Sequence, residues 1–502
     1  MRLGTAACAV AGALISLLAL RAQAVASPPL PEPGFVGPLS SDVQHLHFKY
    51  GPIAIPPGHN LILVGPVTIE KPAYDGYVVG FRPNLVNADG TVPPIEQVHL
   101  HHAVWLNLSR RDTTAPNLPG QRFAAAGEEK TYVKLPAGYG YPVKASDVWA
   151  LNYMVHNETP APQLVWITYD VDFVPASSPL GRKMIPVQPI WMDVQNGKGY
   201  PVFNVYQGSG TNGRFTYPNQ APDAPQLNTW TVDRPGTLVW VGGHLHPGGL
   251  WDDLRIQRGR RSLLLFRSKA RYFDPNGPVS WDLAMTVSRH AWKIAVKKGD
   301  RLQISTTYES RLASWYESMG IMIAFMAPPE RGAIDPFHNP KRIPTTGNIT
   351  HGHLAEASNH GGEATGLPNP ASRPGGETVN DSVGISWFRY LPGDLTFDGT
   401  LGAPPVFHGG QTIHFYNLDA GDQIFHTITA CRDPCTGSTG ISYPLANGPV
   451  NFDSGDLGYG PTGYTAAANR DSWALPANLP PGTYTFFCRI HPFMRGAFRI
   501  VK

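Results

Sequence analysis

Three residues near the C-terminus have side chains that suit a soft metal ion. Cys488, His491 and Met494 offer a thiolate, an imidazole and a thioether at intervals of three residues. A further histidine, His426, lies upstream in an apolar and β-branched run, 422–429, which predicts a strand. Two histidines, one cysteine and a weak axial methionine form the ligand set of a blue, electron-transfer copper centre, called type 1. The sequence therefore predicts a type 1 copper site on a short loop between two strands.

Histidines also gather in the first third of the chain. His101 and His102 stand side by side in the strand-like segment 98–106, and His156 lies in another, 148–157. Adjacent strand residues point to opposite faces, but at a strand end or a bulge both can reach one metal ion. For the pair alone, a polar strand end with solvent-facing rings is the competing interpretation.

A third group combines two histidines with a methionine. His244 and His246 are two residues apart, so on a strand both project from the same face, and the glycines around them allow close approach. Downstream, Met322 and Met326 share one strand face and are expected in the core. Met319 has the opposite parity and lies at the entry of that strand, so it is the predicted soft ligand.

Short strands must position these side chains. The 53 glycines and 50 prolines follow no tripeptide period, which favours many strands joined by turns. A chain of 502 residues is long enough for about three domains. We expect an all-β protein with almost no long helix, with domains at 40–180, 184–330 and 381–502 and a linker at 331–380 that is rich in Pro, Gly and Asn.

The N-terminal segment carries an export signal. Residues 1–24 contain Arg2, an apolar run and the small-residue site Ala22-Gln23-Ala24, which is typical of a cleaved signal peptide rather than a membrane span. We therefore expect a secreted or periplasmic protein. Its low net charge gives no reason to expect binding to nucleic acid or to an anionic membrane. An exported location permits a disulfide between Cys431 and Cys435, although two free thiols remain an alternative.

The C-terminal part of the chain resembles a plastocyanin-type cupredoxin. The resemblance covers about residues 381–502 and rests on residues 410–419, the run around His426 and residues 481–488. It implies a Greek-key β-sandwich around the type 1 site.

The preceding part resembles the catalytic core of the copper type II, ascorbate-dependent monooxygenases, the family of peptidylglycine α-hydroxylating and dopamine β-monooxygenases. The resemblance covers about residues 40–330 and rests on the order of the six ligand candidates and on residues 122–140 and 298–310. It implies two antiparallel, jelly-roll-like β-sandwiches. A first copper site would use His101, His102 and His156. A second, oxygen-activating and catalytic site would use His244, His246 and Met319.

Together these resemblances imply an exported copper monooxygenase that hydroxylates a C–H bond with O₂ and holds about three copper ions per chain. An ascorbate-like molecule or a redox protein would be the external reductant, and the cupredoxin would relay its electrons. The resemblance implies that peptidylglycine hydroxylases, one branch of this family, hold the terminal carboxylate of the peptide at positions that here are Gly242, Ile321 and Ile323. Because these side chains cannot pair with a carboxylate, we expect a small, uncharged, apolar substrate.

Other interpretations remain open. The main alternative is a non-enzymatic, exported copper-binding or electron-transfer protein on the same scaffold. In multicopper oxidases and copper nitrite reductases a histidine stands next to the blue-copper cysteine, whereas Phe487 and Arg489 flank Cys488, which argues against both. His351 and His353 in the linker have ligand spacing, but a hydrogen-bonded or solvated loop is favoured. The remaining histidines are interpreted as structural or exposed: His45, His47, His59, His290 and His338.

Overall fold

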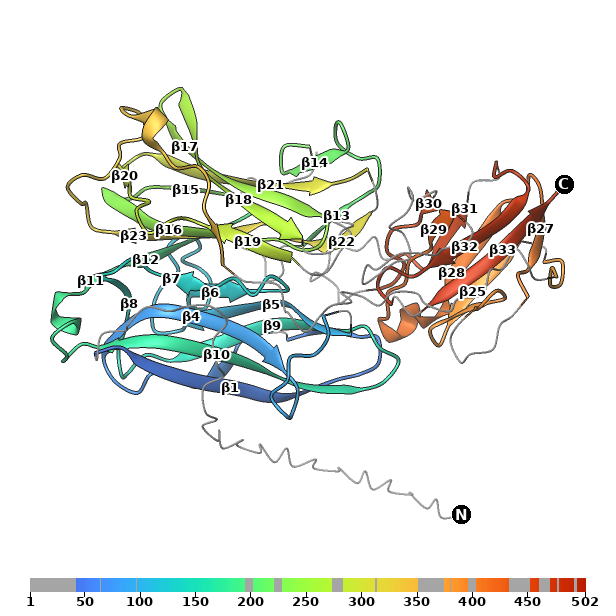
Figure 1. The fold of residues 1–502 in the computed structure, drawn as a ribbon, viewed down its shortest axis with the longest axis horizontal. Helices are drawn as coiled ribbons and strands as arrows, with labels where there is room; N and C mark the ends of the chain where they lie inside the picture. The colour runs from blue at the N-terminus through green and yellow to red at the C-terminus, as the bar shows by residue number, and fades with distance from the viewer. Residues whose placement is uncertain are drawn as a thin grey trace, which may run out of the picture.

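The protein is described by a computed structural model that consists of three β-sandwiches (Figure 1). The described residues are 42–63, 65–95, 97–194, 202–220, 228–272, 283–311, 314–350, 374–379, 381–395, 403–432, 452–459, 470–475, 478–491 and 494–502. The predicted signal peptide, His351, His353, His360, Cys435 and the side chain of Cys431 lie outside them. Helical structure in the described part is confined to three short 3₁₀ helices, η1 (Gly181–Lys183), η3 (Pro340–Arg342) and η5 (Leu418–Asp422). The predicted all-β fold is confirmed.

Among the described residues, no helix is long and apolar enough to cross a membrane.

The first sandwich consists of two sheets. One has the order β1 (Gln44–Ile55), β10 (Gln163–Pro175), β4 (Gly76–Val86), β8 (Tyr139–Val143) and β11 (Ile185–Pro186), with β7 (Val133–Lys134) paired to β4. The other has the order β2 (Asn60–Ile62), β9 (Trp149–Asn157), β5 (Val98–Asn107) and β6 (Gln121–Ala126), with β3 (Val67–Ile69) on β9. Alternate residues of β10, from Val165 to Phe173, are buried between the sheets, as the period of a strand requires.

The second sandwich is built from one long sheet that connects both of its layers. Its order is β12 (Gln188–Asp193), β23 (Ile321–Ala327), β16 (Gly236–His244), β19 (Leu283–Val287), β18 (Arg261–Tyr272), β17 (Gly249–Arg258), β21 (Arg301–Glu309) and β14 (Arg214–Tyr217). Shorter strands add to it: β15 (Thr229–Thr231) on β21, β20 (Ile294–Val296) on β16 and β24 (Asn348–Ile349) on β19. A separate pair joins β13 (Phe203–Val205) to β22 (Trp315–Ser318). Because β24 lies in the predicted linker, the start of that linker belongs to this sandwich.

The third sandwich has a four-stranded and a five-stranded sheet. The first has the order β26 (Arg389–Leu391), β25 (Ser382–Ser386), β28 (Ile413–Asn417) and β31 (Ser472–Leu475). The second has the order β27 (Val406–His408), β33 (Arg495–Val501), β32 (Gly482–Phe487), β29 (Thr429–Arg432) and β30 (Phe452–Asp453). The strand predicted for 422–429 is wrong, because β29 begins only at Thr429 and His426 makes a single isolated bridge to Leu457.

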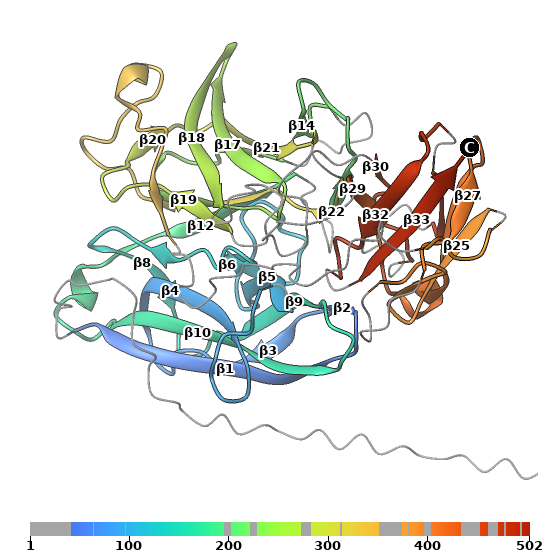
Figure 2. The same cartoon turned by 45° about the vertical axis from the view of Figure 1, so that its right-hand side comes forward.

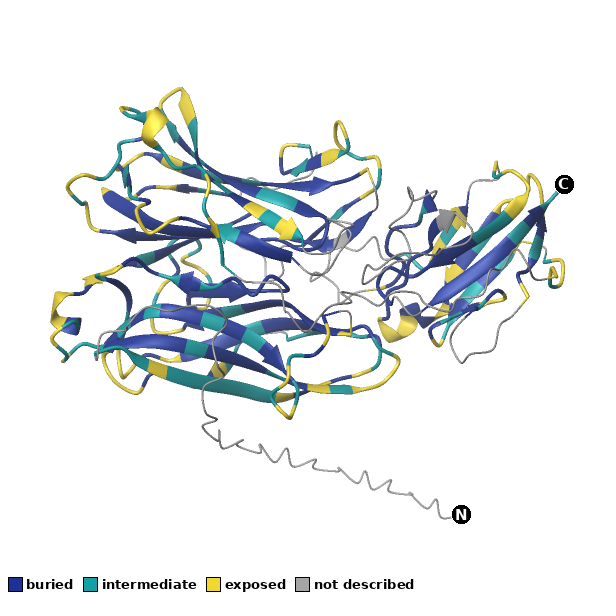
Figure 3. Cartoon of the chain, in the orientation of Figure 1, coloured by how far each residue is buried: buried dark blue, intermediate teal, exposed yellow. Residues whose placement is uncertain are grey.

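The first two sandwiches share a buried interface (Figures 2 and 3). Trp191, Trp240 and Phe325 of the second belong to the same apolar core as the strands of the first. Arg122 of β6 reaches across, with Nη1 3.1 Å from Asp193 Oδ2 and the guanidinium 4.8 Å from the centre of the Trp191 ring. Removing one partner of such a buried ion pair costs about 3–5 kcal/mol. This contact therefore fixes how the two sandwiches face each other.

The third sandwich packs against both of the others. Phe487 is buried in the core of the second sandwich, and the guanidinium of Arg489 lies 5.1 Å from the centre of the Trp315 ring. The backbone N–H of Ser314 donates to Asp453 Oδ2 at 2.5 Å. On the side of the first sandwich, a Cβ added at Gly58 would overlap the Phe388 ring. The loop that carries Cys488 is thus enclosed by protein on two sides.

Candidate metal centres

Three of the predicted ligands of the type 1 site, His426, Cys488 and His491, converge on one point of the third sandwich. Together with Met494, which lies in the same buried core, they are named here the Cys488 centre. Cys488 directly follows β32, and Met494 directly precedes β33, so the loop between the two strands carries three of the four residues. Cys488 Sγ lies 3.9 Å from His426 Nδ1 and 3.8 Å from His491 Nδ1, and the two nitrogens are 3.1 Å apart. All four residues are fully buried.

Neighbouring groups hold these ligands in place. His426 Nε2 is 2.9 Å from Asp419 Oδ2, so a proton on Nε2 leaves Nδ1 to face the sulfur. The backbone N–H groups of Thr427 and His491 donate to Cys488 Sγ at 3.3 and 3.4 Å. Burial alone would raise the pKa of the thiol, but the contacts with both histidines hold the pKa of Cys488 well below its usual range. The thiolate is the form that binds metal.

A bulge arranges the adjacent histidines of β5. The pairing of β5 with β9 shifts register between Leu100 and His102, and the rings of His101 and His102 lie 5.4 Å apart. His156 of β9 is the direct partner of His99 across the strands, and its ring is 4.5 Å from that of His101. The bulge that the sequence analysis allowed for is present, and these rings are buried rather than facing solvent.

Two carboxylates of the first sandwich hold the histidines of the second. His244 is the last residue of β16, and its Nδ1 is 2.9 Å from Glu129 Oε1. His246 Nδ1 is 2.8 Å from Glu128 Oε2. The Nε2 atoms of both histidines have no hydrogen-bond partner. A histidine held at one nitrogen by a carboxylate, with the other nitrogen available, has the arrangement of a metal ligand.

The loop that carries these carboxylates runs very close to the histidines. A Cβ added at Gly127 would lie 2.5 Å from both the backbone oxygen of His101 and the ring of His244. Glycine is therefore required where the loop from β6 passes between the two sandwiches.

The two histidine sets meet at the interface of the first two sandwiches. The ring centres of His101 and His246 are only 3.7 Å apart. Three groups have ligand atoms that all lie within 4.8 Å of one another: His101, Glu128 and His246; His101, His156 and Glu317; His99, His156 and Glu158. These groups share members and form one buried cluster, named here the interface cluster, together with His102, His244 and Glu129.

The grouping differs from the one that the monooxygenase resemblance implies. That resemblance places His101, His102 and His156 on one ion and His244, His246 and Met319 on another. Among the described histidines and carboxylates, the compact groups of the first two sandwiches combine two histidines with a glutamate, and they include neither His102 nor His244. The two sandwiches pack face to face, so the ring of His246 lies 3.7 Å from that of His101, closer than the ring of His156 at 4.5 Å.

Met319 lies between β22 and β23, as predicted, and is buried in the apolar core at the interface. The Tyr308 hydroxyl donates to the Met319 carbonyl at 2.7 Å and accepts from the His246 backbone N–H at 3.1 Å. Tyr308 thus ties the backbone of Met319 to that of His246. Met322 and Met326 are buried in the core of the second sandwich, as expected.

Sequence reasoning missed His99 and the four glutamates. Glu158 follows His156 by two residues, so its position offered a signal, whereas Glu128, Glu129 and Glu317 are distant in sequence from the histidines that they approach. Glu317 has a left-handed backbone, with φ at 49°, which a non-glycine residue rarely adopts outside constrained sites. Burial raises the pKa of Glu317 to about 8 and the pKa of Glu158 well above its usual range.

The donors of the interface cluster fit bound metal ions. Several fully buried atoms have no hydrogen-bond partner: His101 Nδ1, His244 Nε2, His246 Nε2, Glu128 Oε1, Glu129 Oε2, both oxygens of Glu158 and Glu317 Oε1. A buried carboxylate without a partner is costly by several kcal/mol, and a cation removes that cost. Imidazole and carboxylate ligands suit copper, and they also suit zinc and iron.

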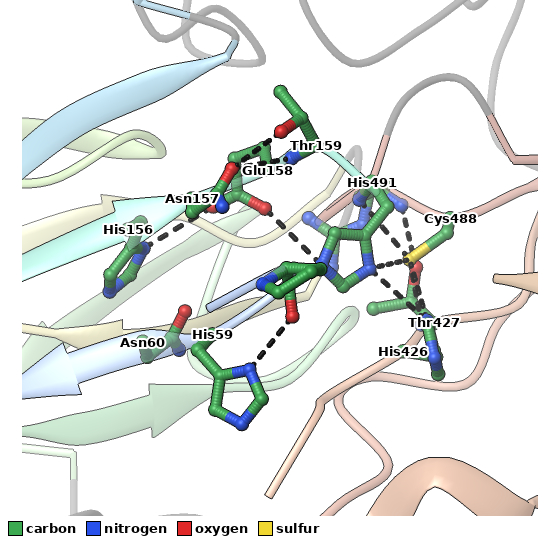
Figure 4. A network of polar contacts seen from close by, with 12 residues as sticks. His59, Asn60, His156, Asn157, Glu158, Thr159, His426, Thr427, Cys488 and His491 are labelled. Carbon is green, nitrogen blue, oxygen red and sulfur yellow. Dashed lines mark hydrogen bonds and ion pairs between the residues drawn. The ribbon is translucent and has the colours of Figure 1, made fainter. Parts of the chain in front are cut away.

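One contact connects the Cys488 centre with the interface cluster (Figure 4). His491 Nε2 lies 3.6 Å from Glu158 Oε2, and Glu158 Oε1 lies 3.4 Å from His156 Nδ1. The connection thus runs through the second nitrogen of a Cys488-centre ligand and does not use Phe487 or Arg489, the residues on either side of Cys488.

Three histidines outside both centres make contacts of a structural kind. His45 Nδ1 is 2.7 Å from Asp172, and His47 Nδ1 is 2.6 Å from Asp170. His59 Nδ1 contacts the Pro57 carbonyl at 2.7 Å. These contacts agree with the structural interpretation from the sequence.

Neither a protein-family model nor a curated protein matches this chain. Similar solved structures include two amicyanin mutants. One is in the Cu(I) form, with 18% identity over 27% of this chain and 91% of that chain (TM-score 0.14). The other is in the reduced state, with 20% identity over 28% and 94% (TM-score 0.14). A Cu-containing nitrite reductase from Thermus scotoductus SA-01 is 14% identical over 54% of this chain and 59% of that chain (TM-score 0.16). At such TM-scores the likenesses decide nothing about function, and each centre is assigned from its own residues.

Proposed function

We propose that this chain is an exported, copper-dependent oxidoreductase in which the Cys488 centre passes electrons to the interface cluster. The observation that carries the proposal is the position of Glu158, between His491 of the Cys488 centre and His156 of the cluster. The donors at both ends are buried, and electron transfer between them needs no movement of the sandwiches.

The residues present suit copper at both ends. A thiolate, two imidazoles and a thioether are the soft set for type 1 copper, and the clustered imidazoles with carboxylates suit copper of the type 2 kind. Copper would supply one-electron transfer at the Cys488 centre and reduction of O₂ at the interface cluster. The protein residues orient the ligands, as the Asp419–His426 and Glu129–His244 contacts do. Burial of the ligands excludes water from both centres.

We further propose that the reaction is hydroxylation of a C–H bond in a small, apolar substrate. This step follows the monooxygenase resemblance. Hydroxylation by O₂ consumes two electrons per turnover. One copper ion stores only one electron, so several adjacent ligand groups, each with its own ion, would supply both. Peptidylglycine hydroxylases bind a carboxylate at three positions that carry no charged side chain in this protein. Here Ile321 and Ile323 are buried in the apolar core, and Gly242 has no side chain.

An external reductant would deliver electrons on the side of the Cys488 centre away from Glu158. His491 is enclosed, but His426 contacts Asp419, and Asp419 Oδ1 accepts from the backbone N–H of Trp387 at 2.9 Å. Trp387 is 80% exposed. This short connection from the surface is a suitable entry for an ascorbate-like molecule or a redox protein.

The alternative is an exported copper-binding or electron-transfer protein without catalysis, and oxygen uptake separates the two. Copper-loaded protein would be reduced without oxygen, exposed to O₂ with small apolar compounds, and followed by oxygen electrode and by mass spectrometry. We expect substrate-dependent uptake and an oxygenated product in the native protein. His246→Ala should lose both while keeping the visible absorption of the Cys488 centre, and His47→Ala, at a structural histidine, should keep all three. No substrate-dependent uptake by the native protein would favour the non-catalytic alternative.

A further inference from the structure

Next to the Cys488 centre lies a group of three donors, two of which belong to neither copper site implied by the monooxygenase resemblance. His99 on β5, His156 on β9 and Glu158 just beyond β9 present ligand atoms that all lie within 4.8 Å of one another. Each of the three residues is at most 2% exposed. The group forms where β5 pairs with β9, because His99 and His156 are direct neighbours across the two strands.

Both ring nitrogens of His99 have hydrogen-bond partners, and these partners set its tautomer. Its Nδ1 is 3.0 Å from the Ile95 carbonyl, which can only accept, so Nδ1 carries the proton. Nε2 therefore holds a lone pair, and it points at His156 Nδ1 from 3.2 Å. This is the second-neighbour arrangement found around metal-bound histidines, in which a backbone carbonyl fixes the tautomer.

Glu158 provides the charge that the group needs. Both of its carboxylate oxygens are buried and accept no hydrogen bond. Oε1 is 3.4 Å from His156 Nδ1 and 3.9 Å from His99 Nε2, while Oε2 faces His491. A carboxylate enclosed in this way needs a compensating positive charge, which a metal ion would provide. The two imidazoles within 4 Å of Oε1 would be the further ligands of that ion.

We propose that His99, His156 and Glu158 bind a divalent transition-metal ion, with copper(II) the preferred one for an imidazole and carboxylate site of this kind. This site is distinct from the Cys488 centre, and it shares only His156 with the first of the two sites implied by the monooxygenase resemblance. Only its role in electron transfer rests on the proposed function, and binding of the ion can be tested without it.

The position of His156 connects the new site to the rest of the interface cluster. Its Nδ1 faces His99 and Glu158, and its Nε2 lies 3.6 Å from Glu317 Oε2. The same imidazole thus stands between two groups of donors. An ion at the new site would lie directly between the Cys488 centre and the remaining histidines.

The test measures copper bound per chain in the full-length protein, with copper(II) as the probe and elemental analysis after removal of free metal. Glu158→Gln and His99→Gln should each bind one copper ion fewer than the native protein, and the double variant should lose no more than either one alone. Matched controls are Glu330→Gln, at a partly exposed carboxylate, and His59→Gln, at another histidine whose Nδ1 contacts a backbone carbonyl. Both controls should bind as much copper as the native protein.

The same samples separate this inference from the proposed function. The visible absorption of the Cys488 centre should persist in Glu158→Gln, because its four ligands are unchanged. Unchanged copper content in a variant that keeps the native circular dichroism would overturn the site.

A measurement on the native protein covers the case in which the variants do not fold. Anomalous scattering at the copper edge from crystals of the copper-loaded protein should show a peak within bonding distance of His99 Nε2 and a Glu158 oxygen. Density for water alone at this point, or a peak only at the other ligand groups, would show that the site holds no copper.

Discussion

His491 Nε2 of the third sandwich lies 3.6 Å from Glu158 Oε2 of the first, and both residues are at most 1% exposed. His491 presents its other nitrogen, Nδ1, to Cys488. One side chain of the Cys488 centre therefore makes direct contact with the carboxylate that borders the interface cluster. The Cys488 centre and the interface cluster are therefore connected through this contact. The contact depends on how the third sandwich packs against the first.

The first prediction concerns the contact between these two sandwiches. Gly58→Ala should slow reoxidation of the reduced Cys488 centre by O₂ by about tenfold or more, because the new Cβ overlaps Phe388 and approaches His491 Nε2 to 3.3 Å. Stopped-flow absorption of the visible band measures this rate. Gly90→Ala is the control, since it also has a positive φ but open space around the added Cβ. Equal rates in the two variants would show that the contact is not on the electron path.

The second prediction tests the ligand that gives the Cys488 centre its colour. Cys488→Ser should abolish the intense visible absorption, because only the thiolate provides the sulfur-to-copper transition. Copper bound to the interface cluster should remain, as elemental analysis can show. A variant that stays blue would mean that the blue centre has been placed on the wrong residues.

The third prediction concerns the carboxylate behind His244. Glu129→Gln should weaken copper binding by the interface cluster about 10- to 100-fold, because the contact of 2.9 Å that orients His244 loses its charge. Competition with a chelator of known affinity measures the change. Glu330→Gln, which removes a carboxylate paired with Lys293, should leave the affinity as it is. If both variants bind copper like the native protein, His244 is not a ligand.

The fourth prediction separates catalysis from colour. Met319→Ile should stop substrate-dependent oxygen uptake without bleaching the visible band. The reason is that Met319 is buried at the interface of the first two sandwiches, whereas the thiolate belongs to the third. Met322→Ile, a change of a core methionine in the adjacent strand, serves as the control and should keep the uptake. Retained uptake in Met319→Ile would remove the thioether from the ligand set.

The fifth prediction concerns the substrate. Copper-loaded, reduced protein should not hydroxylate a peptide that ends in glycine, because Gly242, Ile321 and Ile323 offer no charged partner for its carboxylate. Mass spectrometry of the peptide after incubation gives the answer. Efficient conversion would show that another residue binds the carboxylate.

The sequence by itself determined the local chemistry of the Cys488 centre. Cys488, His491 and Met494 stand within one loop, so their spacing alone places three candidate ligands close together in the chain. The 3₁₀ helix η5 and the segment that follows it add Asp419 and His426. The many glycines and prolines, which follow no tripeptide period, likewise predicted an all-β chain of short strands and turns. The sequence did not predict that the backbone at His426 is irregular rather than a strand. A short apolar run is compatible with both, because either can bury its side chains in the core.

Only the tertiary structure decided how the other histidines are grouped. Spacing along the chain fixes which face of a strand a side chain occupies, but it does not say which faces meet. The shared apolar core and the buried Arg122–Asp193 pair hold the first two sandwiches face to face, which brings His246 against His101 and Glu129 against His244. The same packing encloses Glu158 next to His491. The His246–His101, Glu129–His244 and Glu158–His491 contacts join residues separated by more than a hundred positions, so no local pattern in the sequence could reveal them.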